Sequence, residues 1–548
     1  MDRRDFLRTT MLASAGMTLA PRATQAADAR IDVLLDEPIA RIDPNVYGHF
    51  VEHLGGVVYD GIWVGEQSRI ANTAGIRQAL VDRMRRLPKG VIRWPGGCFA
   101  DSYDWRDGVG PREARPRRTN FWADGMGQRP DGPWKYDTNQ FGTNEFVRFV
   151  RLCEANPYLA ANLRSLPARD FYQWVEYCNS PAGSTTLADL RGKGGSAEPL
   201  RVRFWGVGNE SWGCGGNLTA EEYAVEYRKF TAWVPRFGQE LSFIGSGPNG
   251  GDLGWTRGFF SNLTAKGEGA LASMWGWGLH HYSWNVSRGA TTDWDAGKGD
   301  ALVYTADEWY EMLAQANQME SLITGHWAVM GEIDRRHRVK LVVDEWGTWH
   351  KPGSEVHPSH HLGQQSSIRD ALVAGLTLDT FHRHADKVAM ANIAQLVNCL
   401  QSLFLTDGDK FITTPTYHIF EMYAPHAGAQ AVRTQFGAPS VTYDRVREKA
   451  TVLGLAGSAS VSDRTLTLTV VNTHVTEACD ATIAVRGGRA TAAQAVTLRA
   501  TNIHAHNTFD RPSEVVPGAS AALTAGSGGT LTHRFPPASV TRVTVTLG

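Results

Sequence analysis

The sequence lacks an excess of charge of either sign. Its 55 lysine and arginine residues nearly balance its 56 aspartate and glutamate residues, which leaves a formal net charge of −1. Surfaces that bind nucleic acid or anionic lipid are usually marked by a strong basic excess. The composition therefore predicts neither a nucleic-acid partner nor a membrane partner.

Cysteine is also scarce, and its few positions form no recognisable pattern. CxxC pairs and the Cys/His spacing of zinc sites are both missing, so we expect no metal site and no bound cofactor. We interpret the cysteines as buried or partly buried thiols. They are Cys98, Cys153, Cys178, Cys214, Cys399 and Cys479.

Long apolar runs are absent from the N-terminal region, where residues 11–20 are too short and too weakly hydrophobic to span a bilayer. Arg3-Arg4 followed by Asp5-Phe6-Leu7 resembles a twin-arginine export motif, and small residues up to Ala26 suit a cleavage site. We therefore expect residues 1–26 to be a signal peptide and the protein to be periplasmic or secreted. Export in the folded state would not require disulfides for folding, in agreement with the thiol interpretation.

What the sequence does contain, between residues 43 and 425, is an alternation of short β-type runs and longer helical segments. This alternation is typical of a parallel α/β fold, and eight strands, each followed by a helix, predict a (β/α)8 barrel. Thr219 and Glu222 form a capping box at the start of one helix. The predicted strands are Asn45–Val51, Val91–Pro95, Tyr158–Asn162, Val202–Val207, Leu241–Ser246, Trp277–Tyr282, Lys340–Asp344 and Ala391–Leu396.

Residues 430–548 have a different pattern. Leu466, Leu468 and Val470 alternate with threonines, as expected for half-buried strands, and helical signals are few. We predict a C-terminal antiparallel β-sandwich. The strand-like segment Ile31–Ile39 is a candidate to complete it.

Two glutamates stand out because each follows an apolar strand. Glu210 ends RVRFWGVGNE, and Glu345 directly follows the run KLVVD in KLVVDEWGTW, at the ends of the fourth and seventh predicted strands. These strand ends face each other across a barrel, so the two carboxylates could flank one bond. A retaining glycosidase needs such a pair about 5–5.5 Å apart, and an inverting enzyme about 6.5–9.5 Å apart. Either glutamate alone is better explained as a helix-start charge or a salt-bridge partner. The two together favour glycoside hydrolysis.

Five segments resemble glycoside hydrolase family 51, a family consisting mainly of α-L-arabinofuranosidases with a barrel and a C-terminal β-sandwich. The resemblance covers residues 43–425. The segments are GHFVEHLGGVVYDGIWVG (48–65), VIRWPGGCFADSYDW (91–105), WGVGNESWGCGG (205–216), VVDEWGTWH (342–350) and RHADKVAMANIAQLVN (383–398).

The resemblance implies roles for individual residues. Glu210 matches the acid/base of the GNE segment, and Glu345 matches the nucleophile of DEW. Arg93 of RWPGG is implied to lie against the nucleophile. The remaining matched residues are implied to bind the sugar, and they are Glu52, Asn209, His280, Tyr282 and Gln395.

One position departs from the family pattern. Many members have RWPGGN, whose asparagine helps to bind the furanose, whereas this chain has Cys98. A thiol is a weak hydrogen-bond partner, so that contact is expected to be lost or replaced by backbone or water. We favour a small packed residue over a redox role for Cys98.

The expected function is therefore release of terminal α-L-arabinofuranosyl residues from a glycan by double displacement. An endo-β-1,4-glucanase or β-xylosidase on the same scaffold is the alternative within the enzyme class. A noncatalytic carbohydrate-binding protein is the alternative outside it. Because hexamers are common in the family, the resemblance is also compatible with a homo-oligomer.

Overall fold

The computed structural model describes residues 29–123, 135–285, 297–445, 448–525 and 529–548. The predicted signal peptide, residues 1–26, lies outside these ranges. None of the helices in these ranges combines the length and the apolar composition of a membrane span.

Eight parallel strands close into a barrel, which confirms the predicted fold class. Going around the barrel, the order is β10-β11-β12-β13-β2-β5-β8-β9. Each predicted strand overlaps one of them. Their bounds are β2 (Gly48–Phe50), β5 (Val91–Trp94), β8 (Asn156–Ala161), β9 (Phe204–Val207), β10 (Ser242–Gly245), β11 (Met274–Ser283), β12 (Lys340–Thr348) and β13 (Val388–Ala394).

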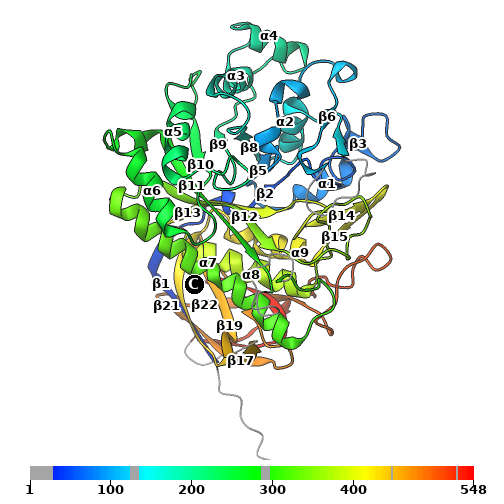
Figure 1. Ribbon diagram of the computed structural model, residues 1–548. Helices are drawn as coiled ribbons and strands as arrows, with labels where there is room; N and C mark the ends of the chain where they lie inside the picture. The colour runs from blue at the N-terminus through cyan, green and yellow to red at the C-terminus, as the bar shows by residue number, and fades with distance from the viewer. Residues whose placement is uncertain (1–28, 124–134, 286–296, 446–447, 526–528) are drawn as a thin grey trace, which may run out of the picture.

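Helices follow the barrel strands, and Figure 1 shows them around the strands. The Thr219 side chain accepts from the Glu222 N–H and the Glu222 side chain from the Thr219 N–H, so the predicted capping box is confirmed. The helices are α1 (Gln78–Met84), α2 (Thr143–Leu152), α3 (Ala168–Asn179), α4 (Thr186–Lys193), α5 (Ala220–Thr231), α6 (Leu253–Leu263), α7 (Ala306–Ile333), α8 (Ile368–Arg383) and α9 (Pro415–Tyr423).

Strand β12 is longer than the predicted Lys340–Asp344. It continues to Thr348 because its neighbour β11 also continues, so that His280 pairs with Glu345 and Ser283 with Thr348. Glu345 therefore lies within a paired strand and not at its end. This pairing places the side chains of two neighbouring strands at one level of the barrel.

Together with β1, the strands of the C-terminal region form a mainly antiparallel sheet in the order β23-β22-β26-β20-β19-β16-β1-β21-β25-β24. Strand β1 (Ala29–Arg41) pairs antiparallel with β16 (Gln430–Gly437) and parallel with β21 (Cys479–Arg486). Apolar residues of these strands form one buried cluster that includes Ile31, Leu468 and Val543. The other strands are β19 (Leu455–Ser462), β20 (Thr465–Asn472), β22 (Ala490–Arg499), β23 (Ala521–Ala522), β24 (Thr524–Ala525), β25 (Leu531–Phe535) and β26 (Ser539–Leu547).

Helices α7 and α8 pack against the C-terminal region, where Figure 1 shows them beside β17 (Ser440–Arg445) and β19. Asp379 of α8 accepts hydrogen bonds from Ser458 and Thr469 at 2.7 and 2.6 Å. The shorter strands form two-stranded hairpins. They are β3 (Asn72–Thr73) with β4 (Ile76–Arg77), β6 (Arg118–Thr119) with β7 (Tyr136–Asp137), β14 (Phe404–Asp407) with β15 (Lys410–Thr413), and β17 (Ser440–Arg445) with β18 (Glu448–Leu453).

Candidate active site

Glu345 of β12 is held by two donors from other barrel strands. Arg93 of β5 donates from Nη1 to Glu345 Oε1 at 2.8 Å, and the Tyr282 hydroxyl of β11 donates to Oε2 at 2.8 Å. Burial raises the pKa of Glu345, but the charges of His280 and Arg93 and these hydrogen bonds outweigh burial and hold the pKa below its ordinary value. Glu345 is therefore kept ionised.

Glu210 directly follows the Gly208-Asn209 break after β9 and faces Glu345. His280 of β11 connects them, because its Nδ1 lies 2.9 Å from Glu210 Oε1 and 3.6 Å from Glu345 Oε2. One carboxylate oxygen of Glu210 and one of Glu345 lie within 4.8 Å of each other. The Glu210 side chain is 22% exposed and that of Glu345 is 7% exposed. Two carboxylates in unlike surroundings thus meet at the carboxyl ends of the strands.

The backbone at Glu210 has an uncommon conformation. Gly208 has a φ of 79° and Glu210 a φ of 38°, in the left-handed region that non-glycine residues seldom adopt. The Glu210 carbonyl accepts from the N–H groups of Gly213 and Gly215 at 2.7 and 3.1 Å. Such a conformation persists where surrounding contacts enforce it, and it is often found at functional sites.

Asn209 is held by hydrogen bonds to both its side chain and its backbone. Its side-chain oxygen accepts from Arg93 Nη2 at 2.6 Å, and its backbone N–H donates to Asp101 Oδ2 at 3.1 Å. Burial raises the pKa of Asp101 to about 7. Asp101 was not singled out in the sequence, since an aspartate in a loop after a strand is common. By accepting from the Asn209 N–H, Asp101 helps to hold the backbone that follows β9 in place.

Glu52 and Gln395 form a reciprocal pair. Glu52 Oε2 accepts from Gln395 Nε2 at 3.2 Å, and Gln395 Oε1 accepts from the Glu52 N–H at 3.1 Å. Glu52 Oε1 also accepts from the N–H groups of Gly97 and Phe99. Burial raises the pKa of Glu52 to about 7. A Cβ on Gly97 would lie 3.0 Å from Glu345 Oε1, so a glycine lets this loop pass close to the nucleophile candidate.

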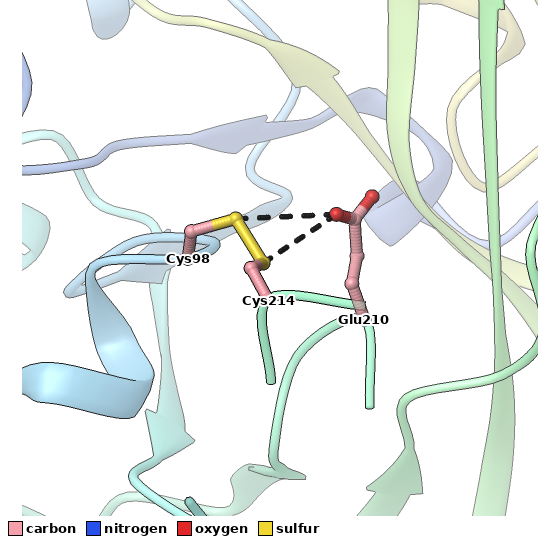
Figure 2. Close-up of side chains that lie close together, drawn as sticks. All are labelled: Cys98, Glu210 and Cys214. Atoms are coloured by element: carbon pink, nitrogen blue, oxygen red, sulfur yellow. Dashed lines mark hydrogen bonds between the residues drawn. A yellow bond between two sulfur atoms is a disulfide. The ribbon is translucent and has the colours of Figure 1, made fainter. Parts of the chain in front are cut away.

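The thiol interpretation is wrong for two cysteines. Cys98 and Cys214 form a disulfide across 116 residues of sequence, and Figure 2 shows it beside Glu210. The two cysteines meet because the loops after β5 and β9 converge at the same end of the barrel. Spacing along the chain does not reveal such a pairing. The other cysteines have free thiols: Cys153, Cys178 and Cys399 are buried, and Cys479 is partly exposed.

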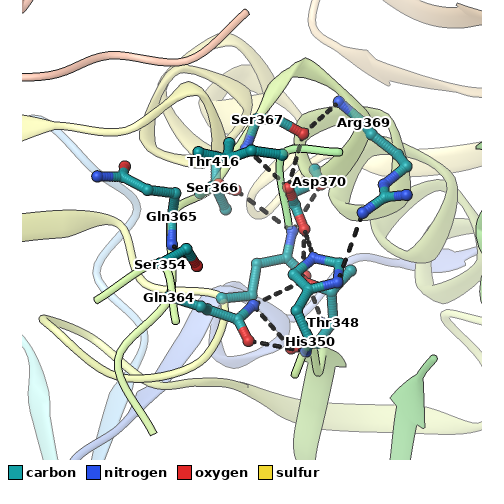
Figure 3. A network of polar contacts seen from close by, with 12 residues as sticks. Thr348, His350, Ser354, Gln364, Gln365, Ser366, Ser367, Arg369, Asp370 and Thr416 are labelled. Carbon is teal, nitrogen blue, oxygen red and sulfur yellow. Dashed lines mark hydrogen bonds and ion pairs between the residues drawn. The ribbon is translucent and has the colours of Figure 1, made fainter. Parts of the chain in front are cut away.

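A buried polar network holds the end of β12, beyond Glu345 (Figure 3). Asp370 at the start of α8 accepts from Thr348 Oγ1 at 2.6 Å and lies 2.8 Å from His350 Nε2. Its other oxygen accepts from the Ser367 N–H at 2.7 Å and from the Ser367 hydroxyl at 3.0 Å. The Asp370 carboxylate thus accepts hydrogen bonds both from Thr348 at the end of β12 and from Ser367 at the N-terminus of α8.

Removal of this carboxylate is expected to destabilise the protein. Asp370→Ala leaves several buried donors without an acceptor, for which we expect a loss of about 3 kcal/mol in the free energy of unfolding. Urea unfolding measures the difference. Asp444, whose side chain is 72% exposed beside Lys449, provides the control. Asp444→Ala should cost less than about 1 kcal/mol, and equal losses in both variants would contradict this account of the network.

The residues nominated from the sequence lie together at this end of the barrel through the contacts described above. Sequence reasoning missed Cys214, Asp101 and Trp122, whose indole Nε1 donates to Glu52 Oε1 at 3.3 Å. The sequence also contains two long loops, 106–137 and 285–304, from which we predict a pocket for a chain end. Parts of both, 124–134 and 286–296, lie outside the described residues.

Comparisons with known proteins agree with one another. Residues 83–296 match the family model "Alpha-L-arabinofuranosidase 1 domain", and residues 344–539 match "Alpha-L-arabinofuranosidase C-terminal domain". An intracellular exo-α-L-arabinofuranosidase of Bacteroides ovatus is 34% identical over 98% of both chains. The GH51 arabinofuranosidase of Xanthomonas axonopodis pv. citri is 34% identical, with a TM-score of 0.86 over 95% of this chain and 100% of the other.

The prediction of a periplasmic or secreted protein is wrong. The Bacteroides ovatus relative is named as intracellular, and so is an exo-α-(1→5)-L-arabinofuranosidase of Streptomyces lividans, which is 27% identical over 87% of this chain and 70% of that protein. The prediction relied on an arginine pair and a short, weakly apolar stretch. Such a short pattern is weaker evidence of location than a similarity to named relatives over most of the chain.

The identity to the Bacteroides ovatus relative extends over nearly the entire length of both chains, so it covers the barrel and the C-terminal sheet together. The fold, the order of the matched segments and the solved Xanthomonas structure agree with it. The chain is therefore a glycoside hydrolase and belongs to the α-L-arabinofuranosidases of glycoside hydrolase family 51.

Proposed function

We propose that this enzyme releases terminal non-reducing α-L-arabinofuranosyl residues by double displacement, with net retention of configuration. The observation that carries the proposal is the pair Glu210 and Glu345, with carboxylate oxygens within 4.8 Å and His280 between them. The closeness of the two carboxylates supports two groups that act on one anomeric carbon, as in a retaining enzyme, and does not favour the wider spacing of an inverting pair.

Glu345 is the nucleophile in this proposal. Arg93 and Tyr282 each donate to one of its oxygens and keep it ionised. One oxygen attacks the anomeric carbon, the bond from that carbon to the leaving oxygen breaks, and a glycosyl ester of Glu345 forms. Ester formation removes the negative charge from Glu345. His280 and Arg93 then face a neutral ester until hydrolysis restores the carboxylate.

Glu210 is the acid/base. It gives its proton to the leaving oxygen in the first step, and as a carboxylate it then takes a proton from the attacking water. The water oxygen bonds to the anomeric carbon while the ester bond to Glu345 breaks. The greater exposure of Glu210 suits this role, because both the departing alcohol and the incoming water must reach it.

Three further residues are proposed to bind the sugar. Asn209 is oriented by Arg93 and Asp101, and its amide nitrogen lies 3.8 Å from Cys214 Sγ, which leaves one of its two N–H groups for a sugar hydroxyl. Glu52 and Gln395 are fixed by each other. A contact from Asn209 that strengthens as positive charge develops on the sugar would lower the barrier and not merely tighten binding.

The substrate assignment is supported by the relatives. Those of Bacteroides ovatus and Streptomyces lividans carry names that describe exo-acting arabinofuranosidases. The site itself does not name the sugar, so a β-xylosidase or endoglucanase remains the alternative against which the proposal is tested.

A panel of nitrophenyl glycosides tests the substrate. We expect release from the α-L-arabinofuranoside and little from the β-D-xyloside or from a cellulosic substrate. Proton NMR of the first product should show the retained anomer. Strong activity on xyloside or cellulose with none on the arabinofuranoside would overturn the substrate assignment, and a first product of inverted configuration would overturn the mechanism.

Tyr282→Phe tests how the nucleophile is kept ionised. The pKa of Glu345 lies below its ordinary value in part because of the Tyr282 hydrogen bond. Loss of this bond raises that pKa, so activity fails at a higher pH as the solution is acidified. We expect the acid limb of kcat/KM to move to higher pH and the rate to fall about tenfold, as for one lost charged hydrogen bond. Tyr227→Phe, at a buried tyrosine on α5, is the matched control, and an unmoved acid limb in Tyr282→Phe would contradict the prediction.

A further inference from the structure

The Cys98–Cys214 disulfide contacts the acid/base directly. Glu210 Oε2 lies 3.6 Å from Cys214 Sγ and 4.0 Å from Cys98 Sγ. Figure 2 shows the two sulfurs beside this carboxyl group. The other carboxylate oxygen is held by His280. The Glu210 carboxyl group therefore lies between an imidazole on one side and a pair of bonded sulfurs on the other.

The disulfide also joins two loops that carry the catalytic machinery. Cys98 lies between Gly97 and Phe99, whose N–H groups both donate to Glu52. Cys214 lies in the turn that closes on the Glu210 carbonyl, and its sulfur is 3.8 Å from Asn209 Nδ2. One covalent bond thus connects the loop after β5 to the turn that sets the uncommon backbone conformation of Glu210.

A disulfide and two thiols offer different chemistry to a carboxyl group. A bonded sulfur has no hydrogen, so in this state neither cysteine donates to Glu210. Reduction by a dithiol breaks the S–S bond, delivers two electrons and two protons to Cys98 and Cys214, and converts the reductant to its own disulfide. Each new S–H group lies where it can donate to Glu210 Oε2. Donors to the ionised form hold a carboxylate in that form, which is the wrong state for a group that must give up a proton.

We propose that the Cys98–Cys214 disulfide is a positioning element for Glu210, and that its reduction impairs protonation of the leaving group. The proposal rests on the assignment of Glu210 as acid/base. Both cysteines are partly exposed, so a small dithiol can reach them. The buried thiols Cys153, Cys178 and Cys399 are already in the reduced form and are unaffected by a reductant.

Two substrates with different leaving groups distinguish a loss of acid catalysis by Glu210 from a general distortion of the active site. An arabino-oligosaccharide needs a proton on its leaving oxygen, whereas 2,4-dinitrophenyl α-L-arabinofuranoside does not. In the reduced enzyme we expect kcat/KM for the oligosaccharide to fall about tenfold or more, because misplaced acid catalysis costs at least that much. For the dinitrophenyl substrate kcat/KM should change less than about threefold, and reoxidation should restore both values.

The double variant Cys98→Ser/Cys214→Ser should behave as the reduced enzyme does and should not respond to the reductant. Cys479→Ser, at a partly exposed thiol in β21, should match the wild type in both states. Reduction is verified by counting thiols by mass spectrometry, and retained folding by circular dichroism. The reductant is also applied to the wild-type enzyme, so the proposal is tested even if the double variant does not fold.

Unchanged rates on both substrates after verified reduction would overturn the proposal. An equal fall on both substrates would also overturn it, because general loosening of the site affects every substrate alike. If the oxidised enzyme hydrolyses neither arabinofuranoside, the proposed function fails and not the role of the disulfide.

Discussion

Glu345→Ala is expected to lower turnover of every arabinofuranoside by about 10⁴-fold or more, since no ester can form without the nucleophile. Arg93 and Tyr282 then surround the space left by the side chain. A small anion such as azide can occupy this space and attack the anomeric carbon from the same face. We expect azide to restore part of the rate on an activated aryl substrate and to give the arabinosyl azide of inverted configuration.

The control for Glu345→Ala is Glu332→Ala. Glu332 is about half exposed in an ion pair with Arg257 on the surface, and its loss should leave activity near that of the wild type. Circular dichroism of both variants shows whether they remain folded. Near-native turnover by Glu345→Ala, or an azide product with retained configuration, would show that another group is the nucleophile.

Glu210→Ala is expected to have the second largest effect, and the effect depends on the leaving group. For an oligosaccharide, kcat/KM should fall about 10²–10⁴-fold, because general acid catalysis typically contributes that much. An activated aryl arabinofuranoside should still form the ester on Glu345. The ester then accumulates, because no base remains to activate water for its hydrolysis.

Azide distinguishes the two glutamates. In Glu210→Ala it attacks the accumulated ester from the opposite face to Glu345, so the arabinosyl azide has retained configuration. Mass spectrometry of the intact protein measures the accumulated ester, and rapid-mixing kinetics should show a burst of the aryl alcohol. If oligosaccharide and aryl substrate lose activity equally and no ester accumulates, Glu210 is not the acid/base.

The barrel and the two glutamates could be predicted because each depends on a local pattern. Apolar runs of strand length, separated by helical segments, identify the eight strands, and a glutamate after such a run identifies a residue at the functional end of the barrel. The end of β12 was misplaced, since the pairing of Ser283 with Thr348 depends on the neighbouring strand and not on the residues of β12 alone.

Contacts between distant residues that neither a local pattern nor the family resemblance marks could not be predicted. Cys98 and Cys214 give no local sign of pairing, and only the convergence of two loops brings their sulfurs together. The hydrogen bond from the Asn209 N–H to Asp101 likewise depends on two loops that are distant in the sequence. The left-handed backbone of Glu210 is accompanied by the turn that follows, whose N–H groups donate to the Glu210 carbonyl, although the nearby Gly208 did mark a sharp break in the chain.

Trapping the sugar on the enzyme tests the central claim most directly, which is that Glu345 and Glu210 act from two sides on one anomeric carbon. Glu210→Ala is mixed with 2,4-dinitrophenyl α-L-arabinofuranoside, digested with pepsin at low pH and analysed by tandem mass spectrometry. The account predicts one pentosyl ester, on the carboxylate of Glu345. A pentosyl group on a different carboxylate, or turnover of this substrate through an inverted first product with no labelled peptide, would contradict it.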